Sequence, residues 1–130
     1  MSDIQIAFNI NKAIVSHSTW KVRLKKSIQT QTSEFDIAYI KSTQSCEFGQ
    51  WLSSAKASLE SDEAYDLVLE LHQSLHEETA RITALALAGN STEAQAAIEP
   101  GSAYAKISSK LTITLMAWKK RAQLLEEPLQ

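Results

Sequence analysis

The three histidines and the only cysteine of this chain restrict its fold, because a fold that uses them together must join distant segments. They are His17, Cys46, His72 and His76. A structural zinc site takes four imidazole or thiolate ligands in a tetrahedron, and the sequence supplies that number with none left over. We therefore predict that these four side chains bind one Zn²⁺ ion. The competing interpretation is three core histidines with hydrogen-bond partners and an inert buried thiol.

Glycine and proline are scarce, and most of them mark gaps between segments with helical periodicity. Gly89, Pro100-Gly101 and Pro128 stand at such gaps, whereas Gly49 lies within a segment. Long helices are expected between the gaps, because both residue types disfavour helix interiors. The predicted helices span residues 3–30, 46–57, 61–88 and, starting at about 92 or 102, a fourth range that ends at 125. Residues 31–45 are predicted to be a connection with room for a helical turn.

The apolar positions of these segments predict an all-α fold. The periodic stripes of the first and third helices include His17 and His72, so both side chains face the core. His76 follows His72 by one turn. Cys46 stands in the first turn of the short helix, where free N–H groups favour a thiolate. Three long helices and one short, Cys-bearing helix predict an antiparallel four-helix bundle, a single domain over residues 1–130.

Composition argues against several classes of function. The formal charge of −2 and the pI near 5.9 give no overall attraction to nucleic acid or to anionic membranes, so neither is expected as a partner. The basic run from Lys21 to Lys26 is interpreted as a solvated helix face. No signal peptide and no apolar run of about 20 residues is found. A single cysteine cannot form an internal disulfide, which favours a reducing compartment, and we expect a cytoplasmic location.

An enzyme is not expected. His72 and His76 have the spacing of the zinc-protease His-Glu-x-x-His helix, but Gln73 stands where that motif has its general base. Glutamine cannot take up a proton in that role, and four protein ligands leave no open coordination position. A di-iron bundle is also disfavoured, because it needs more inward carboxylates and histidines than this pattern presents.

Neighbours of the four candidate ligands suggest how a metal site would be supported. Trp20, Phe48 and Trp51 are expected to pack around it and exclude water, and Gly49 to allow close helix approach. A metal-bound imidazole also needs a partner for its second ring nitrogen. The candidates for this role are Asp36, Glu47, Glu70 and Glu77, although most such carboxylates are solvated.

These motifs resemble the chemoreceptor zinc-binding (CZB) domains of bacteria. His17 is followed shortly by Trp20, the segment Cys46–Leu52 reads CEFGQWL, and His72 and His76 form a His-x-x-x-His pair. The family patterns are a His near a Trp, Cys-x-Phe/Leu-Gly-x-Trp-Leu/Val, and His-x-x-x-His. Trp20 stands three residues after His17, where receptor-attached members usually have two. The longer spacing resembles that of members attached to diguanylate cyclases.

The resemblance implies a helical bundle that forms a twofold homodimer, with one zinc ion per subunit held by three histidines and one cysteine. Family members control a chemotaxis receptor or a diguanylate cyclase in response to zinc or hypochlorous acid. The sequence contains no stretch that reads as a receptor hairpin or a cyclase. We therefore expect the domain to act on a separate signalling protein.

The alternative to sensing is a helical adaptor with a constitutive structural zinc. Sensing is favoured because Cys46 is the only readily oxidised ligand, and oxidation to sulfenic acid removes the charge that binds zinc best. The last helix adds a reason to expect a homodimer. There Ile113 and Leu115 lie on opposite sides of an apolar row that is too wide for one bundle.

Overall fold

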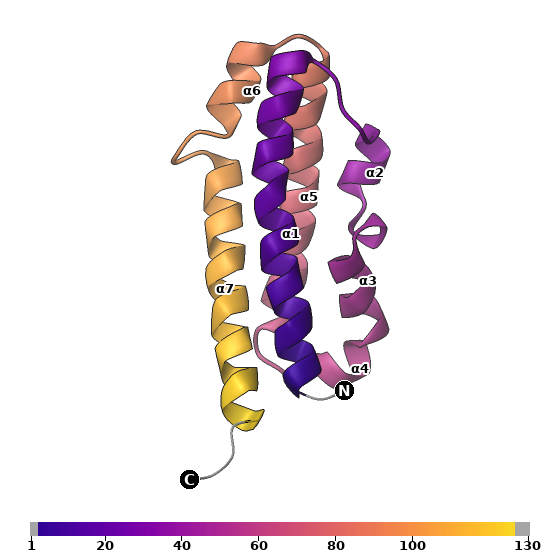
Figure 1. Ribbon diagram of the computed structural model, residues 1–130, viewed down its shortest axis with the longest axis vertical. Coiled ribbons are helices and arrows are strands. Elements are labelled where there is room, and N and C mark those ends of the chain that lie inside the picture. The colour runs from indigo at the N-terminus through magenta and orange to yellow at the C-terminus, as the bar shows by residue number, and fades with distance from the viewer. Residues whose placement is uncertain (1–2, 127–130) are drawn as a thin grey trace.

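The computed structural model describes the backbone of residues 3–126, and every regular element in that range is helical (Figure 1). Three long helices, α1 (Asp3–Thr30), α5 (Tyr65–Leu87) and α7 (Ala103–Glu126), pack along one another. The short elements are α2 (Ile37–Lys41), the 3₁₀ turn η1 (Thr43–Ser45), α3 (Glu47–Ser54), α4 (Lys56–Leu59) and α6 (Ser91–Ala97). The predicted all-α fold class is confirmed.

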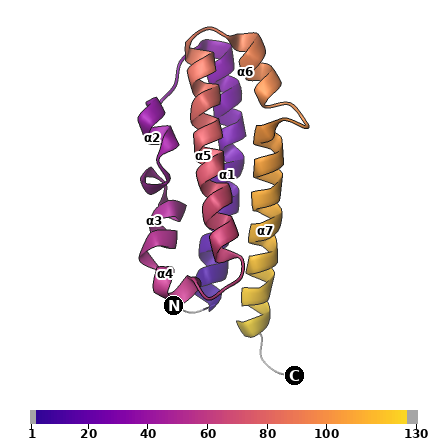
Figure 2. The same cartoon turned by 180° about the vertical axis from the view of Figure 1, so that it is seen from behind.

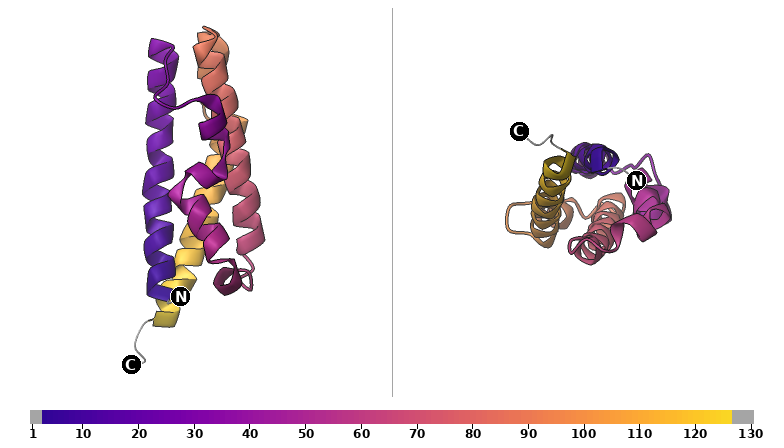
Figure 3. Two further views of the ribbon diagram at one scale, coloured as in Figure 1. Left: turned by 90° about the vertical axis from the view of Figure 1, so that its right-hand side faces the viewer. Right: turned by 90° about the horizontal axis from the view of Figure 1, so that it is seen from below.

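The chain reverses direction at each end of the molecule. α1 runs toward one end, the segment from α2 to α4 returns, α5 runs forward again, and α6 and α7 return (Figures 1 and 2). The segment from α2 to α4 lies across the side of the α1–α5 pair that faces away from α7 (Figure 3). Consecutive segments are antiparallel, but the second is a series of four short elements, where a connection with room for a helical turn and then one short helix were predicted.

Local sequence explains where the helices end. Gln31 has a left-handed φ of 58°, and its N–H donates to the Ser27 carbonyl at 2.7 Å, which closes α1. Gly89 has a φ of 81°, which glycine adopts without strain, and it follows α5 at the predicted stop. Gly101, with a φ of 86°, lies between α6 and α7. The last long helix therefore begins at Ala103, and α6 is a separate element.

α5 begins at Tyr65, later than the predicted start at residue 61. The intervening residues form a turn in which the Asp62 carboxylate accepts a hydrogen bond from the Ala64 N–H at 2.8 Å. Arg121 of α7 pairs with the same carboxylate at 2.7 Å. An aspartate that bonds nearby backbone N–H groups stabilises a turn in competition with a helix, which is why the periodic pattern overestimated this element.

The core lies between the three long helices and α3. It includes Ile10 and Leu24 of α1, Leu52 of α3, Val68 and Ile82 of α5, and Leu111, Leu115 and Trp118 of α7. The apolar stripes predicted for the long helices thus face inward, and their burial is the main stabilising contribution to the fold. Leu115 belongs to this core, so only Ile113 of the pair expected to widen the apolar row faces solvent.

Candidate metal centre

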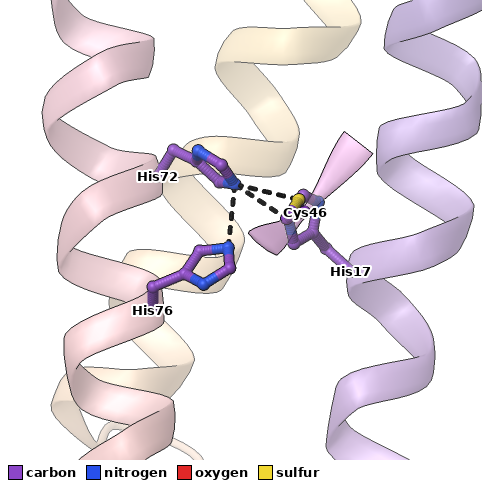
Figure 4. Close-up of side chains that lie close together, drawn as sticks. All are labelled: His17, Cys46, His72 and His76. Atoms are coloured by element: carbon purple, nitrogen blue, oxygen red, sulfur yellow. Dashed lines mark hydrogen bonds between the residues drawn. The ribbon is translucent and has the colours of Figure 1, made fainter. Parts of the chain in front are cut away.

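The four predicted ligands come from three segments and meet at one point (Figure 4). His17 projects from the middle of α1, His72 and His76 from adjacent turns of α5, and Cys46 from the residue before α3. One ligand atom from each residue lies within 4.8 Å of all the others. His72 and His76 are buried, and His17 and Cys46 are partly buried. The fold therefore gathers the full set that the sequence pattern singled out.

The distances between these atoms fit a tetrahedral ion. The Nε2 atom of His72 lies 3.2 Å from Nε2 of His17 and 3.0 Å from Nε2 of His76. The Sγ atom of Cys46 lies 3.6 Å from Nε2 of His72 and 3.8 Å from Nε2 of His17. Zinc with ordinary bond lengths separates two nitrogens by about 3.3 Å and a nitrogen from a sulfur by about 3.6 Å. These four spacings agree with the expected values to within a few tenths of an ångström, and the remaining two pairs of atoms lie within 4.8 Å.

In two of the imidazoles the ring nitrogen that faces away from the centre, Nδ1, makes a hydrogen bond. These hydrogen bonds determine which nitrogen of each ring carries the proton and which carries the lone pair. Nδ1 of His17 donates to the Ala13 carbonyl at 2.8 Å, and Nδ1 of His76 donates to the Ile40 carbonyl at 2.7 Å. A carbonyl can only accept, so both Nδ1 atoms carry the proton and both Nε2 atoms present a lone pair to His72. A proton on His72 can satisfy only one of these lone pairs. A cation at the centre satisfies all of them.

The pKa values of the three imidazoles favour the neutral, metal-binding form. Burial lowers the pKa of His17 to about 4, despite the Ala13 carbonyl, which raises it. Burial and the neighbouring His17 and His76 lower the pKa of His72 to about 2. Burial also lowers the pKa of His76, while its bond to Ile40 raises it. Protons are thus disfavoured at the centre, and the lone pairs are free to bind a metal.

Cys46 differs in two respects from the sequence prediction. It is the N-cap residue of α3 and not part of the first turn. Burial raises the pKa of its thiol, and this effect outweighs the Gly49 and Phe48 N–H groups, which lower it. The free N–H groups of the helix start therefore do not produce a thiolate on their own, contrary to our expectation. A bound metal would supply the missing stabilisation, because a coordinating thiol is deprotonated.

Gly49 permits the approach that places Cys46. A methyl group at position 49 would lie 1.8 Å from the Thr43 carbonyl oxygen and 3.3 Å from Cε1 of His72. The first distance is far inside van der Waals contact, so only glycine allows η1 to lie against α3 here. The close approach predicted for Gly49 is present, although its partner is a 3₁₀ turn and not a long helix.

Of the three aromatic side chains expected around the centre, Phe48 packs directly against candidate ligands. The Phe48 ring meets the edges of His17 and His72, with centroids 5.8 and 5.1 Å apart. Trp51 stacks on Phe48 at 5.8 Å and contacts Trp118 of α7 at 6.2 Å. Trp118 falls within the last helix predicted from the sequence, which gave no sign of this contact. Through it, the surroundings of the metal centre extend to α7.

None of the four carboxylates considered as imidazole partners bonds to a histidine in the described part of the chain. Asp36 caps α2 by accepting from the Tyr39 N–H at 2.7 Å, and Glu47 pairs with Lys12 at 3.3 Å. Glu77 accepts from Gln73 at 3.0 Å, and Glu70 is exposed. Backbone carbonyls take the role instead. The Ala13 carbonyl could have been anticipated as a partner, because it lies one turn before His17 in the same helix. The Ile40 carbonyl could not, because it is distant from His76 in the sequence.

The fold and site define a helical domain whose three histidines and one cysteine form a group that can hold a metal ion. Comparison with protein-family models gives a match to the chemoreceptor zinc-binding domain over residues 17–83, more than half of the chain and inclusive of all four side chains. The chain therefore belongs to the chemoreceptor zinc-binding domain family. No curated protein and no solved structure gave a significant match. Among the described residues, no helix combines the length and the apolar character needed to cross a membrane.

Proposed function

We propose that this protein is a bacterial regulatory domain that binds one Zn²⁺ ion through His17, Cys46, His72 and His76. It responds to zinc or to an oxidant such as hypochlorous acid at Cys46 and signals to chemotaxis or cyclic-di-GMP machinery in the cytoplasm. The observation that carries the proposal is the convergence of four ligand atoms within 4.8 Å of one another in a member of a zinc-binding family. The ligation of zinc by these residues is itself a prediction.

The chemistry of the ligand set favours an oxidant response. A zinc-bound thiolate keeps nucleophilic electron density, whereas the imidazoles are not readily oxidised. The Cys46 thiolate would attack the chlorine of hypochlorous acid and release hydroxide, and water would then displace chloride from the sulfur and lose a proton, giving sulfenic acid. Sulfenic acid is a poor ligand because the charge that binds zinc is gone. One oxidation therefore weakens the metal site.

The position of Cys46 gives this loss a structural consequence. Its segment contains only short helices, none longer than α3 with eight residues, while His17, His72 and His76 belong to α1 and α5, with 28 and 23 residues. Short elements with few buried contacts open at lower free energy than long packed ones. Release of Cys46 is therefore expected to loosen the segment from η1 to α4 and to leave the long helices in place.

Catalysis is not part of the proposal. Four protein ligands leave zinc no position for water or substrate. Gln73, which would occupy the place of the general base, is exposed and donates to Glu77 at 3.0 Å. Its side chain is thus directed along the surface of α5, and it also lacks the required chemistry.

The second candidate is a constitutive structural zinc with no sensing role. Burial of His72 and His76 favours it, because a buried site of this kind holds zinc by about 10–16 kcal/mol and would stay occupied. The two candidates differ in what one equivalent of oxidant does. A sensor loses zinc and local order, whereas a structural site keeps both.

A pulse of hypochlorous acid at one equivalent per chain tests the proposal. Mass spectrometry should find Cys46 oxidised ahead of Met116 and the tryptophans, zinc should appear in solution, and hydrogen exchange should rise in residues 46–57. Met116→Leu is a matched control, because it removes an exposed oxidisable residue from α7 without touching the site. Unmodified Cys46, or oxidation without zinc release, would leave the structural zinc as the correct function.

A further inference from the structure

A cavity of about 540 Å³ opens beside the metal centre, between α1 and the segment from α2 to α3. Cys46 and His76 form part of its wall, and Ser16 of α1 lies on its lining. Trp20 and Phe35 supply aromatic surface, with ring centroids 6.0 Å apart. The cavity volume is within the range of about 300–1,000 Å³ typical of small-molecule sites. A molecule in this cavity lies against Cys46.

The charged side chains on the cavity wall are mostly basic. Lys12, Arg23 and Glu47 line it, and Lys12 is already paired with Glu47 at 3.3 Å. Arg23 has no carboxylate partner among the described residues. Its guanidinium lies over Trp20, 4.8 Å from the ring centroid, and over Phe35 at 5.5 Å. A stacked guanidinium keeps its full charge, so the wall carries one uncompensated positive charge.

The metal centre adds to this charge when zinc is bound. Zn²⁺ with one thiolate and three neutral imidazoles has a net charge of +1. The outer nitrogens of His17 and His76 bond to backbone carbonyls and not to carboxylates, and Glu47, whose charge acts on Cys46, is itself paired with Lys12. The smaller cavity that adjoins at Trp20 and Arg23 carries Lys26 and Glu34, whose charges cancel. Cys46 therefore borders a pocket with a positive potential.

We propose that this cavity is the entrance to the metal centre and that it admits small anions to Cys46 in preference to cations. Partly enclosed clefts with one sign of charge concentrate ions of the opposite sign, and they raise association rates by about 10- to 1,000-fold. The inference rests on the proposed zinc site for part of the charge. It adds to the proposed function the route of access and the charge of the molecules that use it.

Three methanethiosulfonate reagents of different charge test the selectivity on the full chain as purified. Each reagent transfers its alkylthio group to the cysteine sulfur, which forms a mixed disulfide and releases methanesulfinate. Cys46 is the only cysteine of the chain, so the reaction reports on this site alone. The anionic sulfonate reagent should react faster than the cationic trimethylammonium reagent, by about tenfold at low ionic strength after division by their rates with a free thiol. A neutral methyl reagent should fall between them. Salt should bring the ratio toward 1.

Two pairs of variants locate the effect. Arg23→Gln should lower the anion-to-cation ratio about threefold, whereas Lys110→Gln, the same charge change on exposed α7, should leave it unaltered. Ser16→Phe should slow all three reagents alike by narrowing the cavity, and Ser109→Phe on α7 should not. A ratio near 1, an equal fall in both glutamine variants, or no slowing in Ser16→Phe would overturn the proposal. None of these outcomes depends on an oxidant being the signal, so a failure of the proposed function remains distinguishable.

Discussion

The carbonyl of Ile40 accepts a hydrogen bond from Nδ1 of His76 at 2.7 Å. This bond joins α2 to His76, a candidate metal ligand on α5. The two nitrogens of the same ring thus have different functions: Nδ1 holds the backbone of α2, and Nε2 faces the metal centre. Any movement of His76 toward or away from a metal is therefore transmitted to α2, and the predictions below follow from such shared contacts.

Protein purified without added metal should contain one zinc ion per chain, because four ligand atoms of the types that zinc prefers already lie within 4.8 Å of one another. His72→Ala combined with His76→Ala should abolish zinc binding. Cys46→Ala should weaken it more than any single histidine substitution, since it removes the only anionic ligand. Elemental analysis and titration with a competing chelator measure both effects. Ser74→Ala, between the two histidines, is the control and should keep its zinc.

Removal of zinc should lower the melting temperature by about 10–20 °C. A ligand at about 1,000 times its Kd contributes about 4 kcal/mol to stability, and a domain of this size shifts by several degrees per kcal/mol. Calorimetry before and after chelation gives the shift, and added zinc should restore it. Hydrogen exchange should show the larger loss of protection in α2 to α4 and little change in the middle of α5. An equal loss of protection in α2 to α4 and in α5 would show that the metal supports the whole bundle and not chiefly the segment from α2 to α4.

Gly49→Ala should destabilise the protein by about 1–3 kcal/mol and reduce its zinc content. The added methyl group would lie 1.8 Å from the Thr43 carbonyl oxygen, so η1 and the start of α3 must separate, and Cys46 lies between them. Denaturant unfolding and metal analysis check the two parts. Ser54→Ala, on the exposed side of the same helix, should change stability by less than about 0.5 kcal/mol.

Much of the fold and the choice of candidate ligands could be predicted from the sequence because both depend on spacing. Apolar residues at helical intervals indicated α1, α5 and α7, and the scarcity of His and Cys left one possible set of four. The second segment could not be predicted in detail. Its short helices are determined by individual caps and contacts, such as Asp36 with Tyr39 and Gly49 against Thr43, and these have no periodicity.

The environment of each candidate ligand could not be predicted from the sequence either. The pKa of Cys46 depends on the balance between burial and two backbone N–H groups, and burial has the larger effect. The partner of His76 is a carbonyl, which every residue carries, so no residue type marks it. Carboxylates were the visible candidates because only side chains can be read from a sequence. In the structure, Asp36 caps a helix and Glu47 forms an ion pair instead.

The last prediction concerns self-association. Phe8, Val15 and Val22 on α1 are 63, 59 and 69% exposed, and they follow one another at intervals of seven residues, two helical turns. Val15 lies about 160° around α1 from His17 and also lines the cavity beside the metal centre, so this row runs along the exposed side of α1 and reaches the edge of that cavity. Seven-residue spacing is typical of helices that pair with another helix. We propose that two copies of the chain associate as a twofold homodimer through this row.

An antiparallel pairing about Val15 fits the charges on α1. It places Phe8 of one copy against Val22 of the other and keeps the two basic runs, Lys21 to Lys26, at opposite ends of the interface. A parallel pairing would bring these runs together and is disfavoured by repulsion. The twofold axis then passes close to Val15, so a lysine there would meet its own copy.

Light scattering at micromolar concentration should give the mass of a dimer for the wild-type chain. Val15→Lys should give a monomer with unchanged helix content, because the residue is exposed and lysine favours helices. Ile113→Lys is the matched control, since Ile113 is 66% exposed on α7, the helix to which the sequence alone pointed. If Ile113→Lys dissociates the dimer and Val15→Lys does not, the interface lies on α7 and not on α1. A wild-type monomer would remove the dimer, and signals from Cys46 would then have to pass to a different protein without a change in self-association.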